Sequence, residues 1–267
     1  MSNIPVIVVR GKNIPEAWEK AVMATWGEGI AVRTEYDKKG DPPSRDCTMI
    51  MEIEEPMSEP RIHRAFPGGL GDLEVYRQEV MDGVHDHWLE LEEGWHYTYH
   101  ERLFTYRSRD TEINQMDYIV EKLSQATYSR RAQAITWYVD SDPPADDCPC
   151  LQRVWCRIAG EEEPVLNMNT HWRSRDGYKA AFMNIFVITE LQKRIAQRIG
   201  DNIGREIKVG RYVDISDSFH IYGSYYDEFR GFLQTVEARS FEQRTWNTEF
   251  AEPMFQEARE RLEKEEK

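Results

Sequence analysis

The chain has 267 residues, of which 40% are hydrophobic and 12% aromatic. This composition is typical of a packed globular protein and excludes an intrinsically disordered one. With 34 basic against 48 acidic side chains the formal net charge is −14, which argues against general binding to DNA or to an anionic membrane.

The N-terminal third alternates between strand and helix signals. Residues 5–9 are apolar and mostly β-branched, which predicts a strand. Apolar side chains over 14–26 recur at helical spacing, and a second strand is expected over 47–53. Residues 56–71 are rich in Pro and Gly and predict an irregular connection. A helix is expected over 72–84.

The middle of the chain contains the densest polar motifs. Residues 84–102 are crowded with aromatic and histidine side chains. An amphipathic helix is predicted over 114–126 and a strand over 132–139. A loop rich in Asp and Pro leads into the cysteine-containing stretch 147–158, whose alternation predicts another strand.

The C-terminal part begins with a predicted helix over 182–199 and a strand over 204–215, and the tail from residue 240 is charged and helical. No internal repeat or linker is visible, so a single domain over 1–267 is expected. No apolar run approaches the roughly 20 residues that a membrane span requires. Residues 1–10 do not have the pattern of a signal peptide.

The four cysteines are Cys47, Cys148, Cys150 and Cys156. Three of them fall close together, where a disulfide framework is improbable, so we expect a reduced, cytoplasmic protein. Cys150 follows a proline at the start of a strand, and a thiolate there is a candidate nucleophile. The alternatives are a buried structural cysteine and a zinc site with His171, although the cysteine spacing lacks the paired C-x2-C pattern.

Arginines flank this stretch on both sides, at Arg130 and Arg131 and at Arg173 and Arg175. Guanidinium groups bind phosphate bidentately and lower the pKa of a neighbouring thiol. Each cluster alone is usually a solvated surface feature. Together with Cys150 they predict covalent chemistry on a phosphorylated substrate.

A set of motifs follows in order along the chain, namely Arg33-Thr34, Tyr97-Thr98-Tyr99, Asn114 to Asp117, Ser129-Arg130-Arg131, Pro149-Cys150, Arg173-Ser174, Asp176, Asn184, His220 and Tyr222. Together these motifs resemble the thymidylate synthase family, which includes pyrimidine nucleotide hydroxymethylases, and they are most similar to its archaeal branch. The resemblance implies an α+β, three-layer fold with a large mixed sheet at the interface of a homodimer.

The resemblance also implies roles for individual residues. Cys150 attacks carbon 6 of a pyrimidine, Asn184 reads the base edge, and Asp176 lies between nucleotide and folate. Catalytic roles are implied for Cys150, Glu74 (with Glu79 in reserve), Tyr99 and His85, and a folate contact for Trp88. The nucleotide phosphate is held by Arg33, Arg173, Ser174 and the partner subunit's Arg130 and Arg131, and the sugar 3′-hydroxyl by His220 and Tyr222.

The sequence departs from the family pattern at several positions. His85 stands where a tryptophan shields the intermediate from water, and Leu151 follows the nucleophile in place of a histidine. Residues 264–267 are charged where an apolar tail is expected. Four histidines within residues 85–100 leave a metal site as an alternative, against ordinary hydrogen-bonded histidines.

Reductive methylation of deoxyuridylate to thymidylate is therefore the leading prediction, because an amide at Asn184 suits uracil and Ser174 favours a deoxynucleotide. The expected co-substrate is 5,10-methylenetetrahydrofolate or a related reduced pterin, without a metal. One alternative is hydroxymethylation of a uridylate or cytidylate, favoured by His85. Another is a non-catalytic nucleotide or RNA binder on the same fold.

Overall fold

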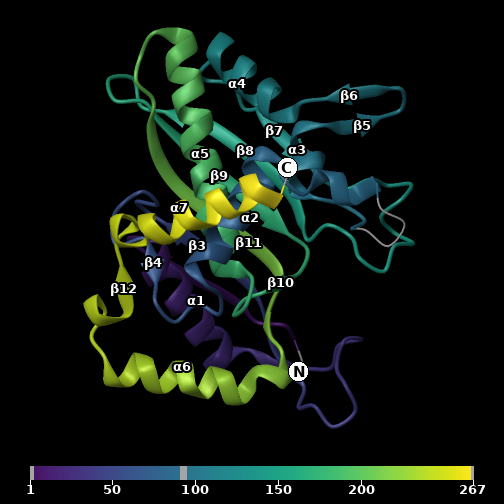
Figure 1. Cartoon of the computed structure of the whole chain (residues 1–267), viewed down its shortest axis with the longest axis vertical. Coiled ribbons are helices and arrows are strands. Elements are labelled where there is room, and N and C mark those ends of the chain that lie inside the picture. Colours follow the sequence, from purple (N-terminus) through teal and green to yellow (C-terminus); the bar gives the residue numbers. More distant parts are fainter. Residues whose placement is uncertain (1–2, 91–94, 266–267) are drawn as a thin grey trace.

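An eight-stranded mixed sheet organises the computed structural model, which describes residues 3–90 and 95–265 (Figure 1). Its strands are β1 (Val6–Gly11), β2 (Ile30–Val32), β3 (Ser44–Ile53), β7 (Gln133–Ile135), β8 (Leu151–Ala159), β9 (Val165–Trp172), β10 (Arg175–Asp176) and β11 (Lys208–Ile221). The main path runs β1-β3-β11-β9-β8-β7, and β2 and β10 pair with β3 and β11. β1 and β3 are parallel, as are β9 and β11, whereas β3 and β11 are antiparallel. The predicted α+β class with a large mixed sheet is confirmed.

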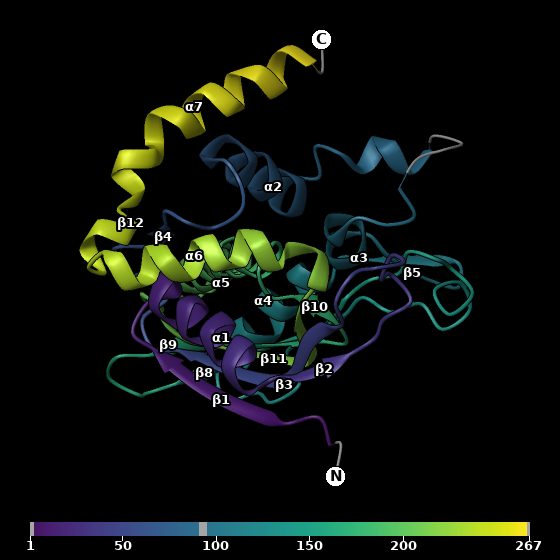
Figure 2. The same cartoon turned by 90° about the horizontal axis from the view of Figure 1, so that it is seen from below.

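Helices lie on one side of this sheet (Figure 2). They are α1 (Ile14–Glu28), α2 (Leu70–Asp82), α3 (Tyr99–Phe104), α4 (Gln115–Gln125), α5 (Ala181–Ile203), α6 (Tyr226–Ala238) and α7 (Thr248–Glu265). α1 and α5 pack on the sheet, α2 packs on α5, and α7 packs on α2. Sheet, inner helices and outer helices form the three expected layers.

Short elements connect these layers. They are the 3-10 turns η1 (Asp86–Glu90), η2 (Gly223–Tyr225) and η3 (Glu242–Arg244), and the two-stranded pairs β4 (Ile62–His63) with β12 (Thr245–Trp246) and β5 (Tyr106–Ser108) with β6 (Thr111–Ile113).

The inner helices follow from apolar periodicity. α1 begins after Asn13, whose side chain accepts the Glu16 amide, and it buries Ala17, Trp18 and Val22. α5 buries apolar side chains along its full length, including Phe182 and Ile195. Both helices therefore have a wide apolar surface. Such a surface is needed because an inner helix packs on the sheet on one side and on other helices on the other.

The opposite face of the sheet is covered by no element of the described chain, as the edge-on view shows (Figure 2). On β1 the side chains of Val6 and Val8 are 66% and 60% exposed. Exposed apolar side chains on a regular sheet face are typical of a surface that meets another chain.

Several predicted boundaries differ from the structure. The strand expected over 132–139 shortens to Gln133–Ile135, because Asp142 accepts the Tyr138 amide and diverts the backbone into a turn. β9 and α6 were not predicted, and the helical tail starts at Thr248 rather than at residue 240. Residues 266 and 267, the end of the predicted charged tail, lie outside the described part.

Candidate active site

A cavity of about 580 Å³ opens where β8 begins, β9 and β11 end, and α5 starts. This volume is within the range of small-molecule sites. Eight predicted site residues line it, namely Tyr99, Cys150, Arg173, Ser174, Asp176, Asn184, His220 and Tyr222. They lie far apart in the sequence, so the fold brings them together.

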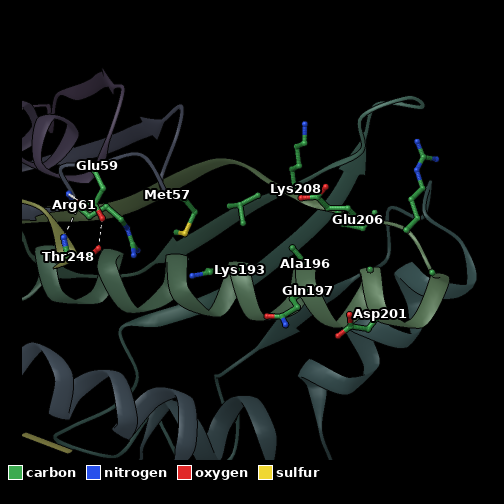
Figure 3. A pocket seen from close by; sticks show the side chains of 15 residues that line it. Met57, Glu59, Arg61, Lys193, Ala196, Gln197, Asp201, Glu206, Lys208 and Thr248 are labelled. Atoms are coloured by element: carbon green, nitrogen blue, oxygen red, sulfur yellow. Dashed lines mark hydrogen bonds between the residues drawn. The ribbon is translucent and has the colours of Figure 1, made fainter. Parts of the chain in front are cut away.

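A larger groove of about 860 Å³ runs along the outer part of α5 and the start of β11 (Figure 3). Its lining is a mixture of both charges, including Lys193, Asp201, Glu206 and Lys208. It contains no cysteine or histidine. The smaller cavity is therefore the candidate active site.

Cys150 lies directly before β8, next to a bulge between Leu151 and Arg153 in its pairing with β9. A bulge re-aims the neighbouring side chain, and the half-buried Cys150 thiol lines the cavity. Burial raises the pKa of Cys150, while the positive charges of Arg173 and Arg175 lower it. The ligand-free thiol is accordingly protonated near neutral pH.

Arg173 holds the loop that carries this thiol. Its Nε donates to the Pro149 carbonyl at 3.0 Å, and its Nη2 donates to the Cys148 carbonyl at 2.7 Å. The Cys148 Sγ lies 3.1 Å from the same nitrogen. The half-buried guanidinium thus places a positive charge beside both thiols.

Arg175 lies beneath the site and is 2% exposed. Its guanidinium pairs with Asp214 and stacks 3.9 Å from the centroid of the Trp172 ring. A fully charged group that is buried and paired in this way is fixed in position. Arg175 therefore supplies a permanent positive charge from below, in addition to Arg173 at the cavity surface.

Asn184, on the first turns of α5, donates from Nδ2 to the Tyr76 hydroxyl of α2 at 2.6 Å. The neighbouring Asp176 accepts the amides of Tyr178 and Lys179 at 3.1 and 2.8 Å, and burial raises its pKa. An amide and a carboxyl group thus face the same cavity.

Two aromatic groups complete the lining near Cys150. The Tyr99 hydroxyl accepts the Leu151 amide at 3.3 Å, and its ring meets Trp172 edge-on. Burial raises the pKa of Tyr99, so its phenol stays protonated. At the far side, His220 is 5% exposed and its ring lies 4.5 Å from that of Tyr222.

Other predicted residues lie outside the cavity lining. Glu74 pairs with Arg77 at 2.6 Å and with Arg259 of α7 at 3.1 Å, while Glu79 contacts His85 Nδ1 at 3.0 Å. Stacking joins His85 to Trp88, with ring centroids 3.9 Å apart. The α2 side chain that reaches the site residues is instead Tyr76.

The other three arginines that were predicted to bind phosphate are exposed on the surface. Arg33 lies beside Asp37 at 3.7 Å, next to the Thr34 to Tyr36 segment that lines the cavity rim. Arg130 and Arg131 do not line the cavity, and the Arg130 carbonyl accepts the Trp155 indole N–H of β8.

Several residues at the site had no role assigned from the sequence, and three of them are informative. Tyr97 lines the cavity with Tyr99, two positions along the chain, and Ser218 lines it with His220. Tyr97 belongs to a motif that was recognised, and Ser218 lies two positions before the His220 motif, so closeness in the sequence was the available signal. Tyr76 had none, because only the packing of α2 on α5 reveals it.

The sequence left open a zinc site at the cysteines and His171 and a metal site at the histidines of residues 85–100. In residues 3–90 and 95–265, no group of three or more His, Cys, Asp or Glu side chains is arranged so that it could hold a metal ion. Cys156 points into the core, where burial raises its pKa to about 12. Within the same ranges no helix is long and apolar enough to cross a membrane.

Comparisons with known proteins relate the chain as a whole to one family. Residues 72–258 match a family model described as thymidylate synthase. A protein of Methanosarcina mazei named "Putative thymidylate synthase" is 27% identical over 86% of this chain and 95% of its own length. One of the same name from Methanocaldococcus jannaschii is 29% identical over 81% and 91%. The structure of thermostable thymidylate synthase A from Bacillus subtilis superposes with a TM-score of 0.60 at 20% identity, covering 82% of this chain and 83% of that one.

Proposed function

This chain belongs to the thymidylate synthase family, and on that premise we propose that it transfers one carbon to carbon 5 of a pyrimidine nucleoside monophosphate through a covalent Cys150 adduct. Methylation of deoxyuridylate to thymidylate is the reaction that the site supports best. The observation that carries the proposal is a single cavity containing a half-buried thiol, an arginine, an amide and a neutral histidine.

The thiol and the arginine divide the first step between them. The Cys150 thiolate adds to carbon 6, and the electron pair of the 5,6 double bond moves toward carbon 5 and the carbon 4 oxygen. A phosphate bound by Arg173 and Ser174 fixes the ring above the sulfur. Carbon 5 then bonds to the one-carbon unit and gives up its proton to a base, and elimination of Cys150 from carbon 6 re-forms the 5,6 double bond and regenerates the thiolate.

The opposite end of the cavity binds the base. The Asn184 amide has one N–H on Tyr76 and keeps a second N–H and its oxygen for the ligand. Uracil presents a carbonyl oxygen next to an N–H, so both of these amide groups find partners, whereas cytosine presents the reverse order and requires the amide to turn over from the orientation that Tyr76 holds. This complementarity supports deoxyuridylate over deoxycytidylate.

The family uses methylenetetrahydrofolate as co-substrate, which supplies the carbon and, in methylation, the hydride. Asp176, which belongs to β10 and lines the cavity, is our candidate contact for its pterin ring. Trp88 and His85 lie stacked on each other outside that lining. We assign them to the folate side, where His85 in place of a tryptophan favours hydroxymethylation as the second candidate.

One assay separates the candidates. Purified protein is incubated with methylenetetrahydrofolate and with dUMP, dCMP or CMP in turn. Methylation oxidises the folate, so dihydrofolate absorbance rises and the product gains a methyl group. Hydroxymethylation leaves tetrahydrofolate and a product heavier by formaldehyde. Absence of both products overturns the proposal in favour of a nucleotide or RNA binder.

The covalent step has its own test. Cys150→Ala is expected to abolish turnover while nucleotide still binds, since the phosphate and base contacts remain. Cys148→Ala is the matched control, because it removes a thiol from the same loop without removing the proposed nucleophile. Equal loss of turnover in both variants, or turnover retained in Cys150→Ala, contradicts the adduct.

A further inference from the structure

Two of the four cysteines are accessible to reagents in solution, and they are two positions apart in the sequence. Cys47 and Cys156 are fully buried in the core, and burial raises their pKa values to about 11 and about 12. Cys148 and Cys150 are half-buried, and all four are free thiols. Chemistry that needs an accessible sulfur is therefore confined to the Cys148-Pro149-Cys150 loop.

One guanidinium lies beside both sulfurs of this loop. The Cys148 Sγ is 3.1 Å from Arg173 Nη2, and the same arginine holds the carbonyls of Cys148 and Pro149. Burial has the largest influence on the pKa of Cys150 and raises it. Arg173 is the strongest influence that lowers this pKa, and a charged Cys148 raises it further. Both sulfurs therefore lie around the same positive charge.

The spacing of the two cysteines permits a bond between their sulfurs. Disulfides usually join Cα atoms that are roughly 4.4–6.8 Å apart. Two residues of fully extended chain span roughly 7 Å, so a small turn at Pro149 is sufficient to close the bond. A ring closed over a single intervening residue is not relaxed, and such a disulfide is readily reduced.

We propose that Cys148 is a resolving thiol for Cys150, and that a small, uncharged peroxide converts the two thiols into a reversible disulfide. One sulfur takes an oxygen as the peroxide O–O bond breaks, which gives a sulfenic acid and releases water or an alcohol. The neighbouring sulfur then forms the S–S bond, and the sulfenic hydroxyl leaves as water with the remaining thiol proton. The two sulfurs lose two electrons in total, and the peroxide gains them.

The disulfide withdraws the Cys150 thiol only temporarily, because a thiol reductant returns both cysteines. Without a neighbouring thiol, more peroxide oxidises the sulfenic acid to a sulfinic acid, which thiol reductants do not reverse. Asp146 and Asp147 line the same cavity, and their charge favours an uncharged oxidant over an anionic one. The effect on turnover rests on the proposed function, whereas formation of the disulfide rests on the loop alone.

Peptide mapping of the full-length, unaltered protein tests the bond directly. The protein is treated with hydrogen peroxide, its remaining thiols are blocked with N-ethylmaleimide, and the tryptic peptide over residues 132–153 is analysed by mass spectrometry. We expect this peptide to lack N-ethylmaleimide and to be lighter by two hydrogen atoms than the reduced peptide. Dithiothreitol should restore the reduced peptide. A sulfinic acid on Cys150, a disulfide to another cysteine or an unchanged peptide overturns the proposal.

Cys148→Ala tests the protective role. Cys148 does not line the cavity, so untreated Cys148→Ala should turn over as the unaltered protein does. After the same treatment we expect at least about fivefold more sulfinic acid on Cys150, with a matching loss of activity that dithiothreitol does not reverse. Equal amounts of sulfinic acid in both proteins contradict the inference. Cys156→Ala, which removes the buried thiol of β8, is the control and should still form the disulfide.

Bound dUMP distinguishes this inference from the proposed function. A nucleotide with its phosphate on Arg173 and its ring over Cys150 shields the sulfur. At a concentration about tenfold above its Kd, dUMP should therefore slow disulfide formation by roughly tenfold. If the disulfide forms equally fast with dUMP, the proposed nucleotide site fails and the resolving role of Cys148 stands. If no disulfide forms with or without dUMP, the resolving role fails, and the turnover assay still decides the function.

Discussion

At the scale of single residues, the reactivity of Cys150 is set by two opposing influences. Burial raises the pKa of Cys150, and the positive charge of Arg173 lowers it more than that of Arg175 does. Because the folded pKa is raised, the reactive thiolate is a minor form near neutral pH and its fraction grows as pH rises. The rate of alkylation by iodoacetamide, measured in a Cys148→Ala background, is therefore expected to keep increasing beyond the ordinary titration range of a free cysteine.

Replacement of Arg173 extends this prediction. Arg173→Ala removes the positive charge and the hydrogen bonds to the Pro149 and Cys148 carbonyls. Alkylation at neutral pH should slow by roughly three- to tenfold, since each unit of pKa changes the thiolate fraction about tenfold. Arg130→Ala, which alters an arginine outside the cavity lining, is the control. Identical pH profiles for all three proteins would exclude activation by Arg173.

The family resemblance, rather than residue types and spacing alone, predicted eight of the 18 residues that line the cavity. Cys150, Arg173, Asn184 and His220 were identified in the sequence and do line one cavity. The hydrogen bond between Ser218 and Asp46 could not be predicted, because the β3–β11 register and its bulge bring the two side chains together. Pairing registers of distant strands are not readable from local pattern.

At the scale of elements, α2 presents a different side chain to the site from the one expected. Glu74 faces Arg77 and Arg259, whereas Tyr76 accepts a hydrogen bond from Asn184. Tyr76→Phe removes that acceptor and lets the amide rotate. We predict a loss of roughly ten- to a hundredfold in kcat/KM and a smaller preference for dUMP over dCMP.

Glu74→Gln is the matched variant on the same helix. It should leave kcat/KM nearly unchanged and lower the free energy of unfolding by roughly 1–3 kcal/mol, because a buried charged hydrogen bond to two arginines is weakened. A large loss of turnover in Glu74→Gln, with Tyr76→Phe unaffected, would restore Glu74 as the catalytic carboxylate. Steady-state kinetics and urea unfolding measure both outcomes.

A second element-scale prediction concerns the attachment of η3 to α1. Glu19 accepts from Arg244 Nε and Nη2 at 2.8 and 2.7 Å and contacts the fully buried His63 at 3.0 Å. Glu19→Gln leaves a largely buried guanidinium without its counter-charge. We expect the free energy of unfolding to fall by roughly 2–3 kcal/mol. Lys12→Gln, at an exposed ion pair with Glu55, should change it by less than about 0.5 kcal/mol.

The two elements that were not predicted differ in their sequence signal. In β9 the buried side chains Leu166, Met168, Thr170 and Trp172 alternate with asparagines and a histidine, so the pattern of a strand was present in the sequence. In α6 only Phe229 and Phe232 are buried, so the apolar periodicity of this helix is weak and tertiary packing decides its conformation.

At the scale of the whole molecule, one sheet face remains to be explained. Helices cover the other side of the sheet (Figure 2), while Val6 and Val8 are exposed on the edge strand β1. Arg130 and Arg131 lie beside β8 rather than in the cavity of their own chain. A single sequence cannot reveal which surfaces of two copies meet. The proposed dimer accounts for both the uncovered face and the displaced arginines.

Subunit complementation tests that arrangement. Cys150→Ala and the double variant Arg130→Ala, Arg131→Ala should each be nearly inactive. Mixed as unfolded chains and refolded together, they form hybrids in half of the dimers, and each hybrid has one site with an intact Cys150 and the partner's intact arginines. Activity should therefore return to about a quarter of that of the unaltered protein. If the arginines act within their own chain, every site in the mixture lacks one component and no activity returns. Val8→Asp, which places a charge on the exposed sheet face, should yield monomers in sedimentation and abolish the recovery.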